Sequence, residues 1–356
     1  MMHMSWNQFR ANNRKDGYSS SELRSLNLTW LKKIGECVSS PVIEDGILYI
    51  ANMFGVVYAI DIINSDIIWR TELKIPIVST PIIHNKMLYL ATFDTWIKGT
   101  RFKDANYIIA LDIDEGKVKW SSKIEGDIFS SLAILNDEII VGSLDNNIYA
   151  IDLEGNIKWI VKTEGPIWSS PSILNDRIII GSDDNHIYKI KSGSIESKIR
   201  LSDKIRSCTP CITDSSILIG TFDGSMYCLD HDYNIKWKKN AEKSILASPS
   251  YANGYCIFAS ADNKIYCFDE DGDELWQFKA SDQFWASPAI TDNAVIVSSL
   301  DTNSYMLDVR NGMILWKFPS MDMIDSSPSI SEDMLFIASR DGILYAFASN
   351  RIEYIK

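Results

Sequence analysis

The sequence predicts an all-β fold, an eight-bladed β-propeller built from four-stranded antiparallel blades. Three observations support this fold class. A unit of about 40 residues recurs along nearly the whole chain, each unit holds four short β-rich runs separated by turns, and the run that the last unit lacks is present near the N-terminus. We therefore expect an N-terminal arm of residues 1–25 and one propeller of residues 26–356.

The unit is clearest in residues 247–276. The dipeptides Asn253-Gly254 and Asp262-Asn263 tolerate positive φ and suit tight hairpin turns. A third turn is expected around residues 271–272, after which a tryptophan at position 276 ends the unit. Four strands joined by three turns make one antiparallel sheet, and such sheets bury both faces when they stack around an axis.

Each unit opens with two small residues and a proline. The triplets begin at Ser39, Ser79, Ser130, Ser169, Cys208, Ala247, Ala286 and Ser326, and Leu132 replaces the proline of the third. Successive starts lie 39 or 40 residues apart, with one spacing of 51. Eight starts predict eight blades.

The eighth unit ends at residues 348–349 without a fourth strand. Residues 26–32 have the pattern of a fourth strand, including Trp30, yet no three strands precede them. We expect this segment to complete the last blade, so that the two ends of the chain close the ring together. The arm before it is expected to lie against the ring, with Trp6 and Phe9 as contacts.

Two units depart from the pattern. The second, residues 79–124, has about eleven extra residues after Asp94, in a hairpin that elsewhere is two to three residues long. Long loops on a rigid scaffold often carry function. The fourth unit lacks its closing tryptophan around residues 191–198.

Composition excludes several classes of function. The chain has 356 residues, a formal net charge of −12 and 46% hydrophobic residues, which argues against nucleic acid or an anionic membrane as the main partner. No segment has the apolar length of a secretory leader or a membrane span. We expect a cytoplasmic monomer, or an exported protein if a leader has been removed.

A motif in the third and fourth strands resembles a known repeat. Residues 110–120 fit the pattern A-x-D-x-x-x-G-x-x-x-W, residues 307–316 share its Asp, Gly and Trp, and residues 150–159 fit it with one residue fewer. The pattern resembles the PQQ-like propeller repeat over residues 26–356, and residues 6–12 are similar to the lead-in before such propellers. WD40 repeats are the rival, but their Gly-His and Trp-Asp dipeptides are absent.

The resemblance implies two kinds of relative. One is the quinoprotein dehydrogenases, which clamp the quinone PQQ with adjacent cysteines and hold calcium near a catalytic aspartate; the other is non-catalytic, such as the BamB-type outer-membrane assembly lipoprotein. This chain has no Cys-Cys pair and only compact blades. PQQ is therefore considered but not favoured, and we expect no cofactor. By size the chain is similar to the scaffold members, without their lipoprotein leader.

Two columns of the repeat keep one residue type and are interpreted as structural. The first consists of tryptophans that we expect to pack between blades: Trp30, Trp69, Trp120, Trp159, Trp237, Trp276 and Trp316. The second consists of turn aspartates, with an acidic cation-binding rim as the alternative: Asp94, Asp145, Asp184, Asp223, Asp262, Asp301 and Asp341.

Two variable columns are the candidate site, because both are expected at the mouth of the central funnel. The residues just before each triplet are Val38, Val78, Phe129, Trp168, Ser207, Leu246, Trp285 and Asp325. The residues just before each turn aspartate are Met53, Phe93, Leu144, Asp183, Phe222, Ala261, Leu300 and Arg340. The residues two positions before each triplet are mostly expected in the core. Arg206 is one of them, and it adds a charge to this face.

An apolar concavity with a few polar groups is typical of a ligand or peptide site. We expect Trp168, Trp285, Phe129, Phe93, Phe222, Asp183, Arg206, Asp325 and Arg340 to bind, with Trp96, Arg101 and Phe102 of the insertion over them. The alternative is that these side chains only plug the channel.

Other motifs are weaker. Cys208 and Cys211 match C-x-x-C, but neighbouring repeats have small apolar residues there, so we interpret them as packing. Residues 269–274 resemble a calcium loop with the glycine misplaced, and a turn is the better interpretation. No metal site and no catalytic set is predicted. The expected function is a binding or scaffold propeller for a protein or peptide; the alternative is an enzyme that uses the funnel, either PQQ-dependent or acting on another small or peptide substrate.

Overall fold

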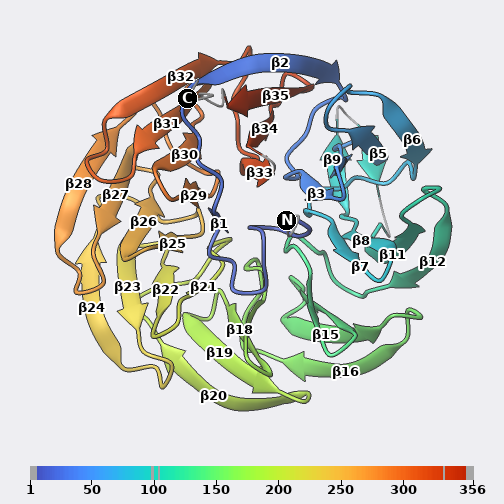
Figure 1. Ribbon diagram of the computed structural model, residues 1–356. Coiled ribbons are helices and arrows are strands. Elements are labelled where there is room, and N and C mark those ends of the chain that lie inside the picture. The colour runs from blue at the N-terminus through green and yellow to red at the C-terminus, as the bar shows by residue number, and fades with distance from the viewer. Residues whose placement is uncertain (1–5, 98–99, 103–104, 332, 350–356) are drawn as a thin grey trace.

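Eight β-sheets stand around a central axis in the computed structural model, and the chain passes through them in order (Figure 1). The structure describes residues 6–97, 100–102, 105–331 and 333–349, and for residues 95–97 and 100–102 it describes the backbone alone. The eight-bladed propeller predicted from the sequence is confirmed. In each blade the first strand lies nearest the axis and the fourth lies on the outside (Figure 1).

The first four blades follow the chain from residue 42 to residue 200. Blade 1 consists of β3 (Val42–Glu44), β4 (Ile47–Ala51), β5 (Val56–Asp61) and β6 (Ile67–Glu72). Blade 2 consists of β7 (Ile82–His84), β8 (Met87–Ala91), β11 (Tyr107–Asp112) and β12 (Val118–Lys123). Blade 3 consists of β13 (Ala133–Leu135), β14 (Glu138–Gly142), β15 (Asn147–Asp152) and β16 (Ile157–Lys162). Blade 4 consists of β17 (Ser172–Leu174), β18 (Arg177–Gly181), β19 (His186–Lys191) and β20 (Ser194–Arg200).

The last four blades complete the ring. Blade 5 consists of β21 (Cys211–Ile212), β22 (Ile217–Gly220), β23 (Ser225–Leu229) and β24 (Ile235–Asn240). Blade 6 consists of β25 (Ser250–Ala252), β26 (Tyr255–Ala259), β27 (Lys264–Phe268) and β28 (Glu274–Lys279). Blade 7 consists of β29 (Ala289–Thr291), β30 (Ala294–Ser298), β31 (Asn303–Asp308) and β32 (Ile314–Pro319). Blade 8 consists of β33 (Ser329–Ser331), β34 (Met334–Ala338), β35 (Ile343–Ser349) and β2 (Leu26–Lys33).

Blade 8 takes its outer strand from the N-terminal part of the chain. Strand β2 pairs antiparallel with β35, with Leu26 opposite Ser349 and Lys33 opposite Ile343. The predicted closure of the ring is therefore confirmed. In blade 2 the extra residues do not form an irregular loop but a separate hairpin of β9 (Thr95–Ile97) and β10 (Thr100–Phe102).

The blades bury their two middle strands and expose the outer one. In blade 1, four of the five residues of β4 and five of the six of β5 are buried, whereas β6 has no buried residue. Because neighbouring blades cover both faces of each sheet, the middle strands are runs of apolar residues rather than alternating ones. These runs of Ile, Val and Leu between adjacent blades are the core.

Tryptophan and glycine interlock at the boundaries between blades. The indole N–H of Trp69 donates to the carbonyl of Ile113 in the next blade at 2.8 Å. A Cβ added at Gly116 of that next blade would lie 2.5 Å from the Trp69 ring, and this glycine has φ +66°. The Gly and Trp of the repeat motif therefore contact each other across a boundary, each from a different blade.

The turn aspartates are hydrogen-bonded within the fold. Asp184 Oδ1 accepts from the backbone N–H of His186 at 2.9 Å, and Oδ2 accepts from the hydroxyl of Tyr188 at 2.6 Å. Oδ2 also accepts from the N–H of Glu164, which belongs to the connection from blade 3. The same Asp–Tyr contact recurs at positions 145, 262, 301 and 341. These contacts explain the aspartate at this turn in blades 3, 4, 6, 7 and 8.

A ring of hydroxyl groups joins all eight blades around the axis. The second residue of every opening triplet is Ser or Thr, and its hydroxyl oxygen accepts from the backbone N–H of the same position in the preceding blade, at 2.9–3.3 Å. The eight residues are Ser40, Thr80, Ser131, Ser170, Thr209, Ser248, Ser287 and Ser327. Ser40 accepts from Ser327, so the ring of hydrogen bonds is closed.

The N-terminal arm runs across the inside of the ring (Figure 1). Its backbone carbonyls accept from the N–H groups of the innermost strands at 2.8–3.1 Å: Asn7 from Ile83, Asn13 from Ile173, Arg14 from Ile212, Asp16 from Tyr251 and Gly17 from Ile290. Trp6 forms a two-way bridge with Ile43. Strand β1 (Tyr18–Ser19) then adds to β29 in parallel. The arm thus covers the free inner edges of six blades.

Two buried cations hold the middle of the arm. Arg10, 2% exposed, donates to the carbonyls of Lys15 at 2.7 Å, Ser248 at 2.8 Å and Pro249. Lys15 is fully buried and donates to Gln8 Oε1 at 2.8 Å. Burial, together with the charge of Arg10, lowers the pKa of Lys15 to about 7.

Candidate functional site

The funnel mouth lies at the end of the ring where the innermost strand of each blade begins. The turn that follows each innermost strand lies at the other end. The backbone of each blade brings the two variable columns together at the mouth, because the residue before the turn aspartate donates its N–H to the connection that leads into its own blade. Phe93 donates to Pro76 at 3.0 Å, Asp183 to Pro166 at 2.9 Å and Arg340 to Met323 at 3.1 Å. Every blade therefore places one side chain of each column at the mouth.

Aromatic rings form one continuous wall of the funnel mouth. The Phe93 and Phe129 ring centroids lie 5.8 Å apart, and those of Phe129 and Trp168 lie 5.2 Å apart. The guanidinium of Arg206 follows, 5.1 Å from the Trp168 ring and 5.7 Å from the ring of Phe222. Blades 2 to 5 thus present a packed aromatic surface with a cation between its last two rings.

Arg206 lies at the mouth and not in the core column to which the repeat alignment assigns it. Ile205, fully buried, takes the core position, because its N–H donates to Ser182 as that of Ile167 donates to Ser143. Ser207 has φ +63°, a left-handed conformation that accommodates one extra residue in this connection. The extra residue turns Arg206 towards Trp168.

Two ion pairs stand on the rim, and one of them is incompletely satisfied. Arg206 Nε donates to Asp183 Oδ2 at 3.1 Å. Arg340 donates through Nε and Nη2 to Asp325 Oδ2 at 2.9 and 2.5 Å, and these bonds raise the pKa of Arg340. The Asp325 side chain is only 5% exposed, yet its Oδ1 has no hydrogen-bond partner in the described part of the chain.

A cavity of about 110 Å³ lies at the base of the mouth. Its floor includes Phe9 of the arm, and its wall combines Phe129, Trp168, Trp285 and Asp325 with hydroxyls of the Ser/Thr ring. Trp285 is 42% exposed, and its indole N–H donates to Gln283 Oε1 at 3.0 Å. The cavity has the volume of a single large side chain and combines apolar walls with acceptor groups.

The structure brings nine of the predicted site residues to this face. Phe129, Trp168, Trp285 and Asp325 line the cavity, and Phe93, Phe222, Asp183, Arg206 and Arg340 contact them or stand beside them on the rim. The other three, Trp96, Arg101 and Phe102, pair within the hairpin of β9 and β10, and their side chains lie outside the described residues.

Sequence reasoning missed three parts of the site. Phe9 reaches the floor of the cavity from the arm, and Gln283 orients the indole of Trp285. The hydroxyl ring also lines the cavity, and a signal for it was present, because the second triplet position is Ser or Thr in all eight blades. Phe9 was expected as a contact between the arm and the ring, but not as a residue of the cavity.

The other sequence motifs are structural. Among the described residues no group of three or more His, Cys, Asp or Glu side chains is arranged to hold a metal ion. Burial raises the pKa of the Cys208 thiol to about 12, and Cys211 is buried without a disulfide. Asp269 Oδ1 accepts from the N–H groups of Asp271 and Asp273, which is a turn. Across the described segments, no helix has the length and apolar character to cross a membrane.

The funnel residues do not fit PQQ. PQQ is a planar tricyclic quinone with three carboxylates, and its site needs cations to balance them. Arg206 and Arg340 are each held by an aspartate, and among the described residues those lining the cavity include a carboxylate and no basic side chain. The cavity of about 110 Å³ is also small for three fused rings.

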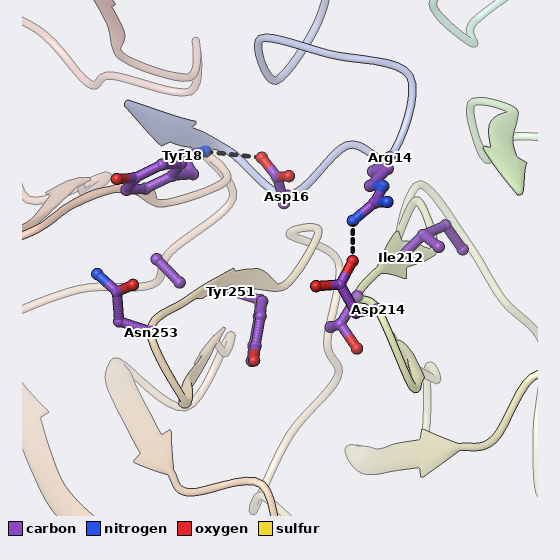
Figure 2. A pocket seen from close by; sticks show the side chains of 9 residues that line it. Arg14, Asp16, Tyr18, Ile212, Asp214, Tyr251 and Asn253 are labelled. Atoms are coloured by element: carbon purple, nitrogen blue, oxygen red, sulfur yellow. Dashed lines mark hydrogen bonds and ion pairs between the residues drawn. The ribbon is translucent and has the colours of Figure 1, made fainter. Parts of the chain in front are cut away.

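A second cavity, of about 260 Å³, lies between the arm and blades 5 and 6 (Figure 2). Arg14 reaches Asp214 at 2.5 Å across it, and Asp16 accepts from the N–H of Tyr18 at 3.0 Å. The Tyr251 hydroxyl donates to a glutamate of the same blade. The polar groups here are occupied by contacts that hold the arm, so we interpret this cavity as a seam in the fold.

The fold and the repeat motif define a class, the PQQ-like β-propellers. A family profile described as outer membrane protein assembly factor BamB matches residues 8–106. A second profile, described as the β-propeller of beta-alanine-activating enzyme, matches residues 104–355. The chain belongs to this family of propellers.

Solved structures share the fold at low sequence identity. BamB from Moraxella catarrhalis is 17% identical with a TM-score of 0.78, over 93% of this chain and 99% of that chain. Quinohemoprotein alcohol dehydrogenase from Comamonas testosteroni is 14% identical with a TM-score of 0.81, over 98% and 81%. A europium-containing methanol dehydrogenase is 14% identical with a TM-score of 0.80, over 97% and 98%. No curated protein matches the sequence. One fold thus carries an assembly factor and two dehydrogenases, and fold likeness alone does not choose between them.

Proposed function

We propose that this protein is a binding propeller whose funnel mouth holds a segment of a protein or peptide partner. The observation that carries the proposal is the combination of an aromatic wall with a buried carboxylate oxygen, Asp325 Oδ1, that has no hydrogen-bond partner among the described residues. Partners are commonly held by aromatic anchors in desolvated pockets. An unpaired buried acceptor costs free energy, about 1–3 kcal/mol, that a partner's N–H or O–H donor would recover.

The size of the cavity supports one inserted side chain rather than a whole small molecule. Trp168 and Trp285 belong to blades 4 and 7, three blades apart in the ring, and both line the cavity of about 110 Å³. An inserted side chain would contact both indoles and reach Asp325 Oδ1.

The alternative, an enzyme acting in the funnel, has less support. Nucleophilic catalysis needs a base within hydrogen-bond reach of the nucleophile. The hydroxyls at the base of the mouth accept from backbone N–H groups, and the lining residues that the structure describes include no histidine, lysine or cysteine. Asp325, the lining carboxylate, is occupied on one side by Arg340.

The test is a selection of linear peptides from a phage-displayed library against the immobilised protein. Selected peptides should bind the native protein and lose affinity for a variant with both Trp168→Ala and Trp285→Ala. The Asp325→Asn variant should weaken the same peptides, because its amide oxygen would face the Arg340 guanidinium and leave an NH₂ group, which cannot accept a hydrogen bond, towards the peptide. Peptides that bind the double variant as well as the native protein would place the binding surface elsewhere.

A further inference from the structure

A notch of about 350 Å³ between blades 3 and 4 has no counterpart in the predicted site. We call it the blade 3–4 notch, and it is lined by Leu135, Asn136, Glu138, Trp159, Asp176, Ile178 and Ser192. Asn136 also lines a cavity beside the arm residues Asn7 and Gln8. The notch therefore opens where the innermost strands end, whereas the funnel opens where they begin.

The notch exists because one turn in blade 4 is short. At the boundary of blades 2 and 3, the turn of residues 153–156 supplies the carbonyl of Leu153, which accepts from the indole of Trp120 at 2.7 Å. In blade 4 only Ser192 and Gly193 join β19 to β20, and no carbonyl of this two-residue turn accepts from the Trp159 indole. The indole N–H of Trp159 donates instead to Glu138 Oε2 of its own blade, at 2.9 Å.

The charges in the notch leave one carboxylate without a cation. Asp176 is paired with Arg177 at 2.5 Å and with Lys191 at 2.8 Å. Glu138 has no basic partner among the described residues, and its carboxylate lies against the edge of the Trp159 indole. Leu135 and Ile178 supply an aliphatic wall. An aromatic ring beside a carboxylate that lacks a cationic partner favours the binding of a cation with a planar group or an aliphatic stem.

We propose that the blade 3–4 notch binds the basic side chain of a partner protein, an arginine or a lysine, between Trp159 and Glu138. The guanidinium or ammonium group would pair with the Glu138 carboxylate, and its aliphatic arm would lie against the indole ring. Beside the notch, β20 exposes Ile195 at 43%, next to the aliphatic wall of Leu135 and Ile178. These apolar flanks favour a cation carried by a protein over a free one, because a protein also covers them.

The test uses three probes and the assigned indole ¹⁵N–¹H signal of Trp159, identified by its loss in Trp159→Phe. N-acetyl-arginine amide should move this signal, and the neutral isostere N-acetyl-citrulline amide should not. A peptide with arginine between leucines should bind at least about fivefold tighter than the amide, since it also covers the flanks. Equal affinity for peptide and amide would identify a free cation as the ligand and overturn the protein assignment.

Two controls separate binding from loss of structure. Glu138→Gln keeps an acceptor for the Trp159 indole but removes the charge, so arginine affinity should fall about fivefold while the thermal midpoint stays unchanged. The Trp120 indole, covered by its turn, should not move in any titration. If arginine and citrulline move Trp159 equally, or Glu138→Gln binds arginine as the native protein does, the proposal is wrong.

Discussion

Lys189 Nζ donates a 2.6 Å hydrogen bond to the carbonyl of His231, in the place where an indole N–H donates at other blade boundaries. In five boundaries the acceptor is the residue directly after the aspartate that begins the third turn: Ile62, Ile113, Leu153, Glu270 and Val309. His231 follows Asp230 in the same way. A lysine therefore makes the contact that the missing tryptophan of blade 4 would make.

The ring of the missing tryptophan is replaced as well. Tyr233 stands at the turn position that is glycine in blades 2, 3, 6 and 7, keeps a φ of +72° and is 7% exposed. Lys189 Nζ lies 4.6 Å from the centroid of the Tyr233 ring. Ser197 occupies the position of the missing tryptophan. It pairs with Lys189 in blade 4, as Trp159 pairs with Ala150 in blade 3. Blade 4 has exchanged one Trp–Gly contact for a set of three side chains.

Tyr233→Gly should therefore destabilise the protein by about 3 kcal/mol, the usual cost of emptying a buried aromatic site. Adding Ser197→Trp and Lys189→Ala to it should restore most of the loss, because the standard contact is rebuilt. Chemical denaturation with fluorescence detection would measure both. Tyr233→Phe is the control and should be neutral, since the hydroxyl of Tyr233 has no hydrogen-bond partner within the described segments. Additive losses in the triple variant would contradict this account.

The two N-terminal segments should differ in what their removal does. Deleting residues 1–34 removes β2, leaves β35 as an unpaired edge and should cause aggregation. Deleting only residues 1–25 removes the arm but keeps β2, and should give a monodisperse protein that melts at a lower temperature. Light scattering and thermal unfolding of the two deletions test this. A 1–34 deletion that melts within a few degrees of the full chain would disprove the closure.

The repeat predicts the fold and most of the funnel because every blade has the same geometry. Once Trp168 and Asp325 occupy one column of the repeat, their common placement follows without any knowledge of contacts. The register fails at Arg206, because one extra residue with a left-handed Ser207 is offset by the short turn of Ser192 and Gly193, and the triplet spacing of 39 residues stays unchanged.

The path of the arm is not predictable from residue patterns. Its contacts use backbone carbonyls of residues such as Asn7 and Asn13, and every residue type carries that group. The blade 3–4 notch also depends on the backbone rather than on side chains, because it results from a turn of only two residues, Ser192 and Gly193. The sequence shows that blade 4 is irregular, but only the structure shows which contact its short turn removes.

Lys15 should make stability depend on pH. Its folded pKa of about 7 lies below its ordinary value of 10.5 because of burial and of Arg10, so the unfolded chain binds more protons between these pH values. Stability from this group therefore rises with pH across that window and is lost as pH falls towards 7.

Lys15→Met removes this buried charge. We expect the variant to melt at least about 2 °C higher than the native protein at pH 7, and the difference to shrink at pH 9.5, where the native lysine is neutral. Scanning calorimetry at both pH values gives the comparison. A difference that is constant with pH would mean that Lys15 does not titrate in the folded state.

Trp168 and Trp285 are expected to serve binding, and Trp276 to serve the fold. Trp285 is 42% exposed, whereas Trp276 is 7% exposed and donates its indole N–H to Val309 at 2.8 Å. Changing both Trp168 and Trp285 to Ala should weaken selected funnel peptides by about 2 kcal/mol or more, the usual threshold for an anchor residue, and should cost little stability. Trp276→Ala should instead cost about 3–5 kcal/mol of stability and leave peptide affinity unchanged in the protein that remains folded. Calorimetric titration and denaturation of the same three proteins separate the two effects. A double variant that unfolds easily but still binds would show that the aromatic wall only fills the channel, and the binding surface would then have to be sought at the hairpin of β9 and β10.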